Sequence, residues 1–153
     1  FLTGGTVLNN AGSISGGTGG KGGNAPGSSF SSGGGDGGNG GIGVYASGPA
    51  TIINSGSITG GTSGSAGTGS SAATSGAVGD AGVAILGADL TVINSGTISG
   101  GLQTGGLLPV NAITFTGGSN VLELQAGSAI SGNVVGTGTD TLRLGGVNDS
   151  TFD

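Results

Sequence analysis

The chain has 153 residues, of which 42 are glycine, and a formal net charge of −5. Its two basic residues are too few to displace counterions from phosphates, which argues against binding to nucleic acids or anionic membranes. The absence of histidine and cysteine excludes Ser-His-Asp and Cys-His catalytic arrangements, disulfides and thiolate metal sites. No apolar run reaches the length of about 18 residues that a membrane-spanning helix needs, so we expect no membrane insertion.

A repeated stretch organises the chain. Residues Thr91–Gly101 match Thr51–Gly61 position for position, and they match Thr6–Gly17 with one inserted residue. Each copy predicts a short strand, a tight Asn/Gly turn, a second short strand and a Gly-Gly pair. One copy cannot bury its own apolar side chains, whereas several stacked copies can, so the repeat predicts a solenoid.

Glycine-rich excursions at 16–40 and 60–80 separate these copies, and a shorter connection follows at 100–111. The first excursion opens with a local three-residue period that starts at Gly16-Gly17-Thr18. This period suits extended threefold helices of the polyproline II type, pairs of which can lie against each other. A flexible linker is the alternative interpretation of the same composition.

The last part of the chain keeps the repeat without the excursions. Leu122 and Leu142 lie 20 residues apart, and short apolar runs alternate with glycine-containing turns between them. Three short strands in roughly 20 residues are typical of one coil of a parallel β-helix. We therefore expect one all-β domain over residues 1–153, a right-handed parallel β-helix of about five coils. Because the chain begins within the pattern at Phe1, we expect it to be an excised fragment or a mature segment.

Stacking of the coils predicts which side chains face inward. Leu122, Leu124, Leu142 and Leu144 alternate with polar residues, so we place them in the interior. Glu123 and Arg143 then share the outer face one coil apart and should form an exposed ion pair, worth well under about 1 kcal/mol.

The asparagines of the repeat predict a ladder at one corner of the coils. We expect Asn9, Asn54 and Asn94 to stack with their amides bonded along the axis, because asparagine tolerates turns and satisfies backbone groups there. Ligand contact is the functional alternative for these residues. The glycines that follow, Gly12, Gly56 and Gly96, are predicted to supply positive φ in the turn.

Neighbours in a strand face opposite ways, so inward Ile52 and Val92 would leave Leu8, Ile53 and Ile93 as an apolar stripe outside. An exposed stripe of this kind indicates a partner or a covering element. We favour cover by the glycine-rich excursions, with self-association as the alternative.

Two Gly/Asp motifs resemble calcium-binding turns. Residues 136–142 partly match the nonapeptide that binds Ca²⁺ in β-rolls, and Asp36 lies among glycines. Each Ca²⁺ needs six or more oxygen ligands from motifs in tandem, and here the motif occurs once. We therefore expect structural turns, with no metal and no cofactor.

The element Thr91–Gly101 resembles the strand-turn-strand repeats of bacterial autotransporter passenger domains. The stretches Asn111–Gly118, Gly127–Val134 and Thr139–Gly146 resemble the same family more specifically. The resemblance covers nearly all of the chain outside the two long excursions. It implies a secreted or surface-exposed β-helical stalk of a Gram-negative bacterium, exported through a C-terminal outer-membrane β-barrel.

The functional expectation is a non-enzymatic, adhesin-like stalk segment that contacts a host or sibling cell surface, or copies of itself. An alternative is the subunit of an extracellular filament or other homo-oligomer, assembled by end-to-end stacking of β-helices. A second alternative, a polysaccharide-active β-helical enzyme, is disfavoured because such sites need clustered acids, and the seven acids here are scattered.

Overall fold

The computed structural model describes residues 1–27, 31–70 and 73–145, and this part of the chain is all-β. It contains no helix, and therefore none long enough to span a membrane. Thirteen short strands alternate with turns and extended connections. In chain order they are β1 (Thr6–Asn10), β2 (Ser13–Ser15), β3 (Val44–Tyr45), β4 (Ala50–Asn54), β5 (Ser57–Thr59), β6 (Ile85–Gly87), β7 (Leu90–Asn94), β8 (Thr97–Ser99), β9 (Ile113–Phe115), β10 (Ser119–Leu124), β11 (Ala129–Ser131), β12 (Val134–Val135) and β13 (Thr139–Leu144).

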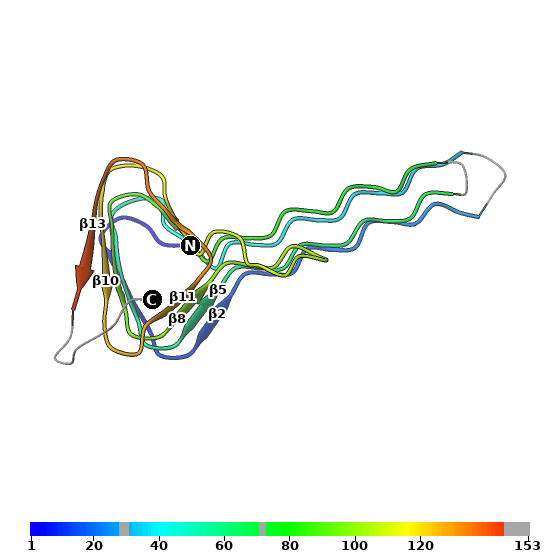
Figure 1. The fold of residues 1–153 in the computed structure, drawn as a ribbon. Helices are drawn as coiled ribbons and strands as arrows, with labels where there is room; N and C mark the ends of the chain where they lie inside the picture. Colours follow the sequence, from blue (N-terminus) through cyan, green and yellow to red (C-terminus); the bar gives the residue numbers. More distant parts are fainter. Residues whose placement is uncertain (28–30, 71–72, 146–153) are drawn as a thin grey trace.

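The strands form three parallel sheets. The first sheet has the order β1-β4-β7-β10-β13, the second β2-β5-β8-β11 and the third β3-β6-β9-β12. Consecutive strands thus belong to different sheets, and one pass through all three makes one layer of a β-helix-like arrangement. The layers lie one behind another in Figure 1, and the sheets enclose a common interior.

The register between layers is the one that the repeat predicts, except in the first copy. Leu122 pairs with Leu142, and Asn54 pairs with Asn94, as expected from their spacing. In the first copy, however, Leu8 pairs with Ile52 and Asn10 with Asn54. The predicted inserted residue is wrong, because the first copy begins at Val7 and matches the other copies without a gap.

The core is made of inward-facing side chains from all three sheets, which are aliphatic except for Phe115. Ile52 and Val92 are fully buried and stack in the first sheet, and Ile58 and Ile98 do the same in the second. Branched side chains suit this arrangement, because they pack well against equivalent side chains on a pleated surface. Burial of one such side chain contributes about 1.5–3 kcal/mol.

The four leucines predicted to face inward differ in how far they are exposed to solvent, depending on their layer. Leu122 and Leu124 are buried, whereas Leu142 and Leu144 are 61% and 58% exposed. All four lie in register, so their direction is as predicted. The exposure of Leu142 and Leu144 follows from their position, because β13 is the end strand of the first sheet in the described chain.

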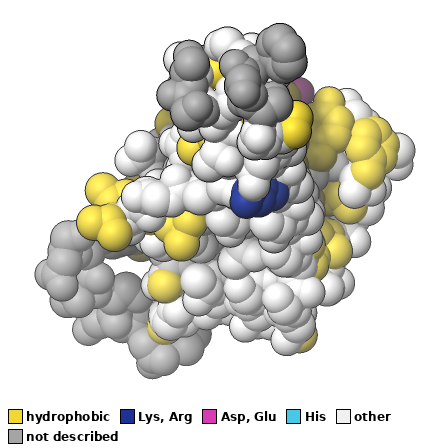
Figure 2. All heavy atoms as spheres, turned by 90° about the vertical axis from the view of Figure 1, so that its right-hand side faces the viewer, with side chains coloured by type: hydrophobic (Ala, Val, Ile, Leu, Met, Phe, Trp, Pro, Cys, Tyr) yellow, Lys and Arg dark blue, Asp and Glu magenta, His cyan; other side chains and the backbone are white. Residues whose placement is uncertain are grey.

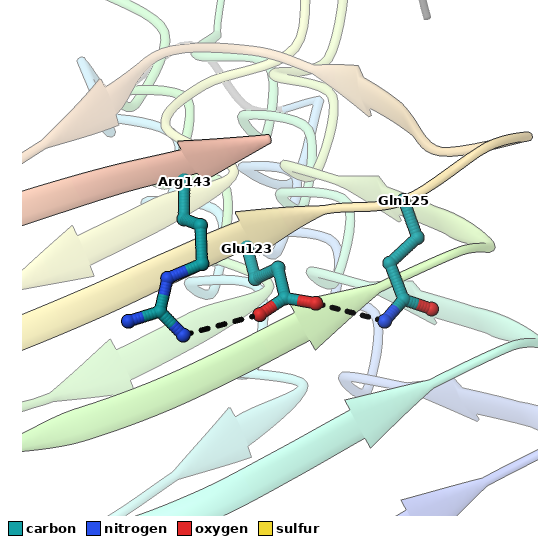
Figure 3. Close-up of polar contacts among 3 residues, drawn as sticks. All are labelled: Glu123, Gln125 and Arg143. Carbon is teal, nitrogen blue, oxygen red and sulfur yellow. Dashed lines mark hydrogen bonds and ion pairs between the residues drawn. The ribbon is translucent and has the colours of Figure 1, made fainter. Parts of the chain in front are cut away.

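The outer face of the same strands carries the predicted ion pair. A guanidinium nitrogen of Arg143 lies 3.4 Å from a carboxylate oxygen of Glu123, and the amide of Gln125 donates to the other oxygen at 2.9 Å (Figure 3). The Arg143 side chain is mostly exposed, so solvent screens the pair and its net contribution is small.

Leu122 and Leu142 provide a matched test of the layered core. Leu122→Ala should lower the free energy of unfolding by about 2–5 kcal/mol, because it opens a cavity among packed side chains. Leu142→Ala should cost less than about 1 kcal/mol, because most of that side chain is already in contact with solvent. Urea denaturation followed by far-UV circular dichroism measures both. Equal losses for the two variants would contradict the assigned core.

Candidate functional site: the asparagine ladder and the glycine spine

The corner between the first and second sheets contains a ladder of buried asparagines. The side-chain amide of Asn10 donates to the Asn54 oxygen, and that of Asn54 donates to the Asn94 oxygen, both at 2.8 Å. Asn54 also donates to the backbone carbonyl of Thr97 in the next layer at 3.1 Å. Asn54 and Asn94 are fully buried, so the ladder joins layers and offers these two side chains to no ligand.

The predicted membership of Asn9 in this ladder is wrong. Asn9 is exposed and pairs with Ile53, and its neighbour Asn10 occupies the ladder position. A shift of one residue turns every side chain of a strand to the opposite face, so the choice between adjacent asparagines decides the register. The Asn-x-Gly spacing shared by Asn10, Asn54 and Asn94 was the available signal.

The glycines after the ladder have a different role from the predicted one. None of Gly12, Gly56 and Gly96 has a positive φ. Instead, a Cβ atom on Gly56 would overlap the carbonyl oxygen of Gly12, and one on Gly96 would overlap that of Gly56. Glycine is therefore required at Gly56 and Gly96, because each of these turns is in direct backbone contact with the turn of the preceding layer, whereas nothing lies within 4 Å of the Cβ position of Gly12.

Replacement of a ladder asparagine should be costly. Asn54→Ala removes one hydrogen bond from each of Asn10, Asn94 and Thr97 in a buried corner, so we expect a loss of about 1–3 kcal/mol in unfolding free energy. Asn9→Ala is the control and should change stability by no more than about 0.5 kcal/mol. Thermal denaturation of both variants makes the comparison, and the reverse ranking would restore Asn9 to the ladder.

The predicted apolar stripe is shorter than expected. Leu8 packs against the core, so it does not belong to the outer face. The outer row contains Asn9, Ile53, Ile93 and Glu123 in register, and Ile53 is 38% exposed. The glycine-rich segments leave the body on the side away from β10 and β13 (Figure 1), so the expected cover of this row by the excursions is wrong.

A second polar corner was not predicted. The buried Asn120 side chain accepts a hydrogen bond from the backbone of Leu90 and donates to the Asp140 carboxylate, both at 2.8 Å. Its register with Asp140, 20 residues away, was the available signal. Asp140 belongs to the motif considered for calcium, and it is used here as a hydrogen-bond acceptor within the fold. The described residues contain no cluster of three acids suited to a metal.

The two glycine-rich excursions form one elongated projection, which we call the spine (Figure 1). Two outgoing segments and two return segments run side by side along it. Backbone hydrogen bonds between them recur at every third residue, as expected for polyproline II geometry and not for a flexible linker. The segments are residues 16–27 (first outgoing), 31–43 (first return), 60–70 (second outgoing) and 73–84 (second return).

The hydrogen bonds connect each segment to several neighbours. The first outgoing segment donates to the second, and the first return segment donates both to the first outgoing segment and to the second return segment. The second outgoing segment donates to the first return segment. Representative donor–acceptor pairs are Gly19 N to Thr62 O (2.8 Å), Gly38 N to Gly20 O (2.7 Å), Gly40 N to Asp80 O (2.8 Å), Gly64 N to Gly38 O (2.8 Å) and Gly79 N to Gly64 O (3.1 Å).

Glycine allows these segments to approach so closely. A Cβ atom on Gly19 would overlap the carbonyl oxygen of Gly38, and one on Gly64 would overlap that of Gly20. The same holds at three-residue intervals along each inner side of the spine, where the side-chain-free backbones are in contact. The spine therefore has backbone hydrogen bonds in place of a side-chain core.

Short polar side chains complete the network on the outside of the spine. The Asp36 carboxylate accepts from the amide of Ala77 at 2.7 Å, and the Asn39 side chain accepts from that of Asp80 at 2.8 Å. Asn24 accepts from Thr68 at 3.0 Å. Asp36, considered above for calcium, thus joins two return segments. The recurrence of Asp or Asn beside Gly-Gly pairs was the sequence signal for these bridges.

Comparisons with protein-family models, with curated proteins and with solved structures gave no match. Function is accordingly inferred from the ladder and the spine.

The connection after β8 supports the base of the spine. It is a short hairpin in which Leu102 and Pro109 form an antiparallel bridge. The hydroxyl of Thr104 donates to the backbone carbonyl of Ser63 in the second outgoing segment at 2.6 Å. Its tip leaves Leu107 and Leu108 95% and 81% exposed.

The side from which the spine projects has little charge. Figure 2 shows this side as mostly backbone and uncharged polar atoms, with hydrophobic side chains gathered toward its left and right margins. A contact on this side would therefore use backbone, hydroxyl and apolar groups more than ion pairs.

Gly64 and Gly20 test the packing of the spine. Gly64→Ala should lower stability by about 1–3 kcal/mol and raise the amide exchange rates of the spine, because the new methyl group overlaps the Gly20 carbonyl. Gly20→Ala adds a methyl group where nothing lies within 4 Å, so it should leave both properties unchanged. Hydrogen–deuterium exchange of the two variants makes the comparison. Equal exchange rates in both would mean that the segments are not packed together.

Proposed function

We propose that this chain is a non-enzymatic structural and adhesive segment of a secreted, autotransporter-like protein at the surface of a Gram-negative bacterium. In this proposal the three parallel sheets are a right-handed parallel β-helix of about five coils, which serves as a stiff stalk. The spine is the element that reaches a host cell, a sibling cell or another copy of the chain.

The observation that carries this proposal is the order of the spine and its sideways projection from the body (Figure 1). Hydrogen bonds at every third residue on several sides hold each segment, so the spine keeps its shape without a hydrophobic core. An ordered projection loses less conformational entropy on contact than a flexible loop does. This favours recognition over a simple linker role.

Several of the carboxylates that an enzyme could use have structural partners in the described part of the chain. Asp140 is bonded to Asn120, Asp36 to the backbone of Ala77, and Glu123 to Arg143 and Gln125. Together with the lack of histidine and cysteine in the sequence, these contacts favour a contact role over catalysis.

The exposed hairpin residues Leu107 and Leu108 add a second contact element at the base of the spine. Adjacent exposed leucines on a tight hairpin are typical of interaction sites. The hairpin is held against the spine through Thr104 and Ser63, so both elements belong to one side of the molecule.

Removal of the spine tests this function. Gly132 and Asn133 join β11 directly to β12, which shows that a layer closes without an excursion. Deletion of residues 17–42 and 61–83 joins Gly16 to Gly43 and Gly60 to Ala84 in the same way. Beads coated with the full chain should adhere to cultured epithelial cells or to bacteria, and beads coated with the deletion variant should adhere no more than albumin-coated beads.

The controls separate adhesion from folding. The deletion variant should keep the far-UV circular dichroism signal of its sheets and a cooperative thermal transition, because no core residue of β4, β7 or β10 is removed. A folded deletion variant that adheres as well as the full chain would exclude the spine as the contact element. Full-chain beads that bind neither surface would overturn the adhesive function itself.

A further inference from the structure

The spine has two faces along the direction in which the layers stack, and these faces differ in the side chains that cover them. One face belongs to the second outgoing and return segments, on the side of the later strands. The other belongs to the first outgoing and return segments, on the side of β1, β2 and β3, which are the end strands of their sheets.

Register through the strands fixes the equivalent positions. Ser15 of β2 pairs with Thr59 of β5, so Gly17 corresponds to Gly61, and every third residue after it corresponds likewise. In the second outgoing segment these positions are Gly61, Gly64 and Gly67. Their amides donate to carbonyl oxygens of Gly41, Gly38 and Gly35, and their missing Cβ atoms leave room for the carbonyls of Gly17, Gly20 and Gly23.

The first outgoing segment has glycine at the same positions but no neighbour there. Nothing lies within 4 Å of the Cβ positions of Gly17, Gly20 and Gly23. Within the described part of the chain their amides donate no hydrogen bond. Glycine in an extended segment costs conformational entropy, so three glycines with open space beside them need a physical reason.

We call Gly17, Gly20 and Gly23 the open stripe. Each free amide of the open stripe lies about 9 Å from the next one, because a polyproline II segment rises about 3.1 Å per residue and the amides are three residues apart. This is the spacing at which an equivalent return segment presents its carbonyl oxygens to Gly61, Gly64 and Gly67. The open stripe thus has the donors and the free space of an inner layer.

The opposite face of the spine is closed by side chains. The first pair of segments has glycine at positions 19, 22 and 37. The second pair has side chains at the equivalent positions, namely Ser63, Ala66 and Val78. Ser63 is also bonded to Thr104 of the hairpin. A further glycine-repeat layer cannot approach this face as closely as the first pair approaches the second.

From these observations we propose that the open stripe is a docking surface for one more pair of glycine-repeat segments. The occupant is the excursion of a further β-helical coil that pairs in parallel with β1, in continuity with the interface between the first two layers. A second copy of this chain stacked through its later strands is not the occupant, because its layers of β7, β10 and β13 would lie between its own spine and the open stripe. The proposal goes beyond the adhesive function and does not depend on it.

A tandem duplication tests the fit. Thr6 pairs with Ala50, so a second copy of residues 6–49 inserted before Thr6 adds one layer in register, with its own excursion. The amide exchange of the original Gly17, Gly20 and Gly23 should then slow to the rates of Gly61, Gly64 and Gly67 in the same molecule. In the unmodified chain the open stripe should exchange like unprotected amides.

The matched control is the same duplication with residues 17–42 removed from the added copy. It should protect the amides of β1 that face the new layer and leave the open stripe unprotected. Protection of β1 without any change at the open stripe in the complete duplication would overturn the proposal.

If the duplicated chain does not fold, the amides of Gly61, Gly64 and Gly67 lose their protection, and a second measurement replaces the first. A synthetic peptide of residues 31–43 is then titrated into the isotope-labelled full chain. Shifted amide resonances of Gly17, Gly20 and Gly23, abolished by Gly20→Val, would support the proposal. No shift at millimolar peptide would overturn it.

Discussion

The structure depends on parallel backbone pairing at a fixed register from one layer to the next. Each strand contributes only a few residues, so no strand is stable alone, and the pairing places like side chains above like side chains. Ile52 above Val92 and Asn54 above Asn94 are consequences of one alignment. A shift of one residue would bury Thr51 and expose Ile52, so the register decides which side chains form the core.

The same register serves two kinds of packing. In the body, aliphatic side chains meet across the interior, and buried amides satisfy each other at the asparagine corner. In the spine, backbones meet directly because glycine recurs at every third residue along the inner sides of the segments. Backbone hydrogen bonds therefore supply the order that hydrophobic burial supplies in the body. The body fixes where each segment of the spine begins, and the segments continue the pairing outward.

This division explains why the described chain can extend far to one side with few large residues. The hairpin and the side chains at Ser63, Ala66 and Val78 close one face of the spine, while the glycines of the other face stay open. The spine is thus directional, like the stack of strands that carries it. In the proposed function, a directional side arm would present the same surface each time that the layered unit is displayed.

The sequence by itself determined the stacking of layers, because the same pattern of short apolar runs and glycine-containing turns recurs along the chain, as Leu122 and Leu142 show. It also indicated the threefold period of the first excursion, without deciding between order and a flexible linker. Only the tertiary structure decided that question, because a glycine segment has no side chains to reveal its neighbours, and its order comes from carbonyls in other segments. The shared Asn-x-Gly spacing pointed to Asn10 rather than Asn9 as the ladder residue, and the pairing of β1 with β4 decided which of the two faces inward. The direction of the spine, away from Ile53, is also a property of the tertiary structure. It is set by the place where the chain leaves the body between β2 and β3, and not by any residue of the excursion itself.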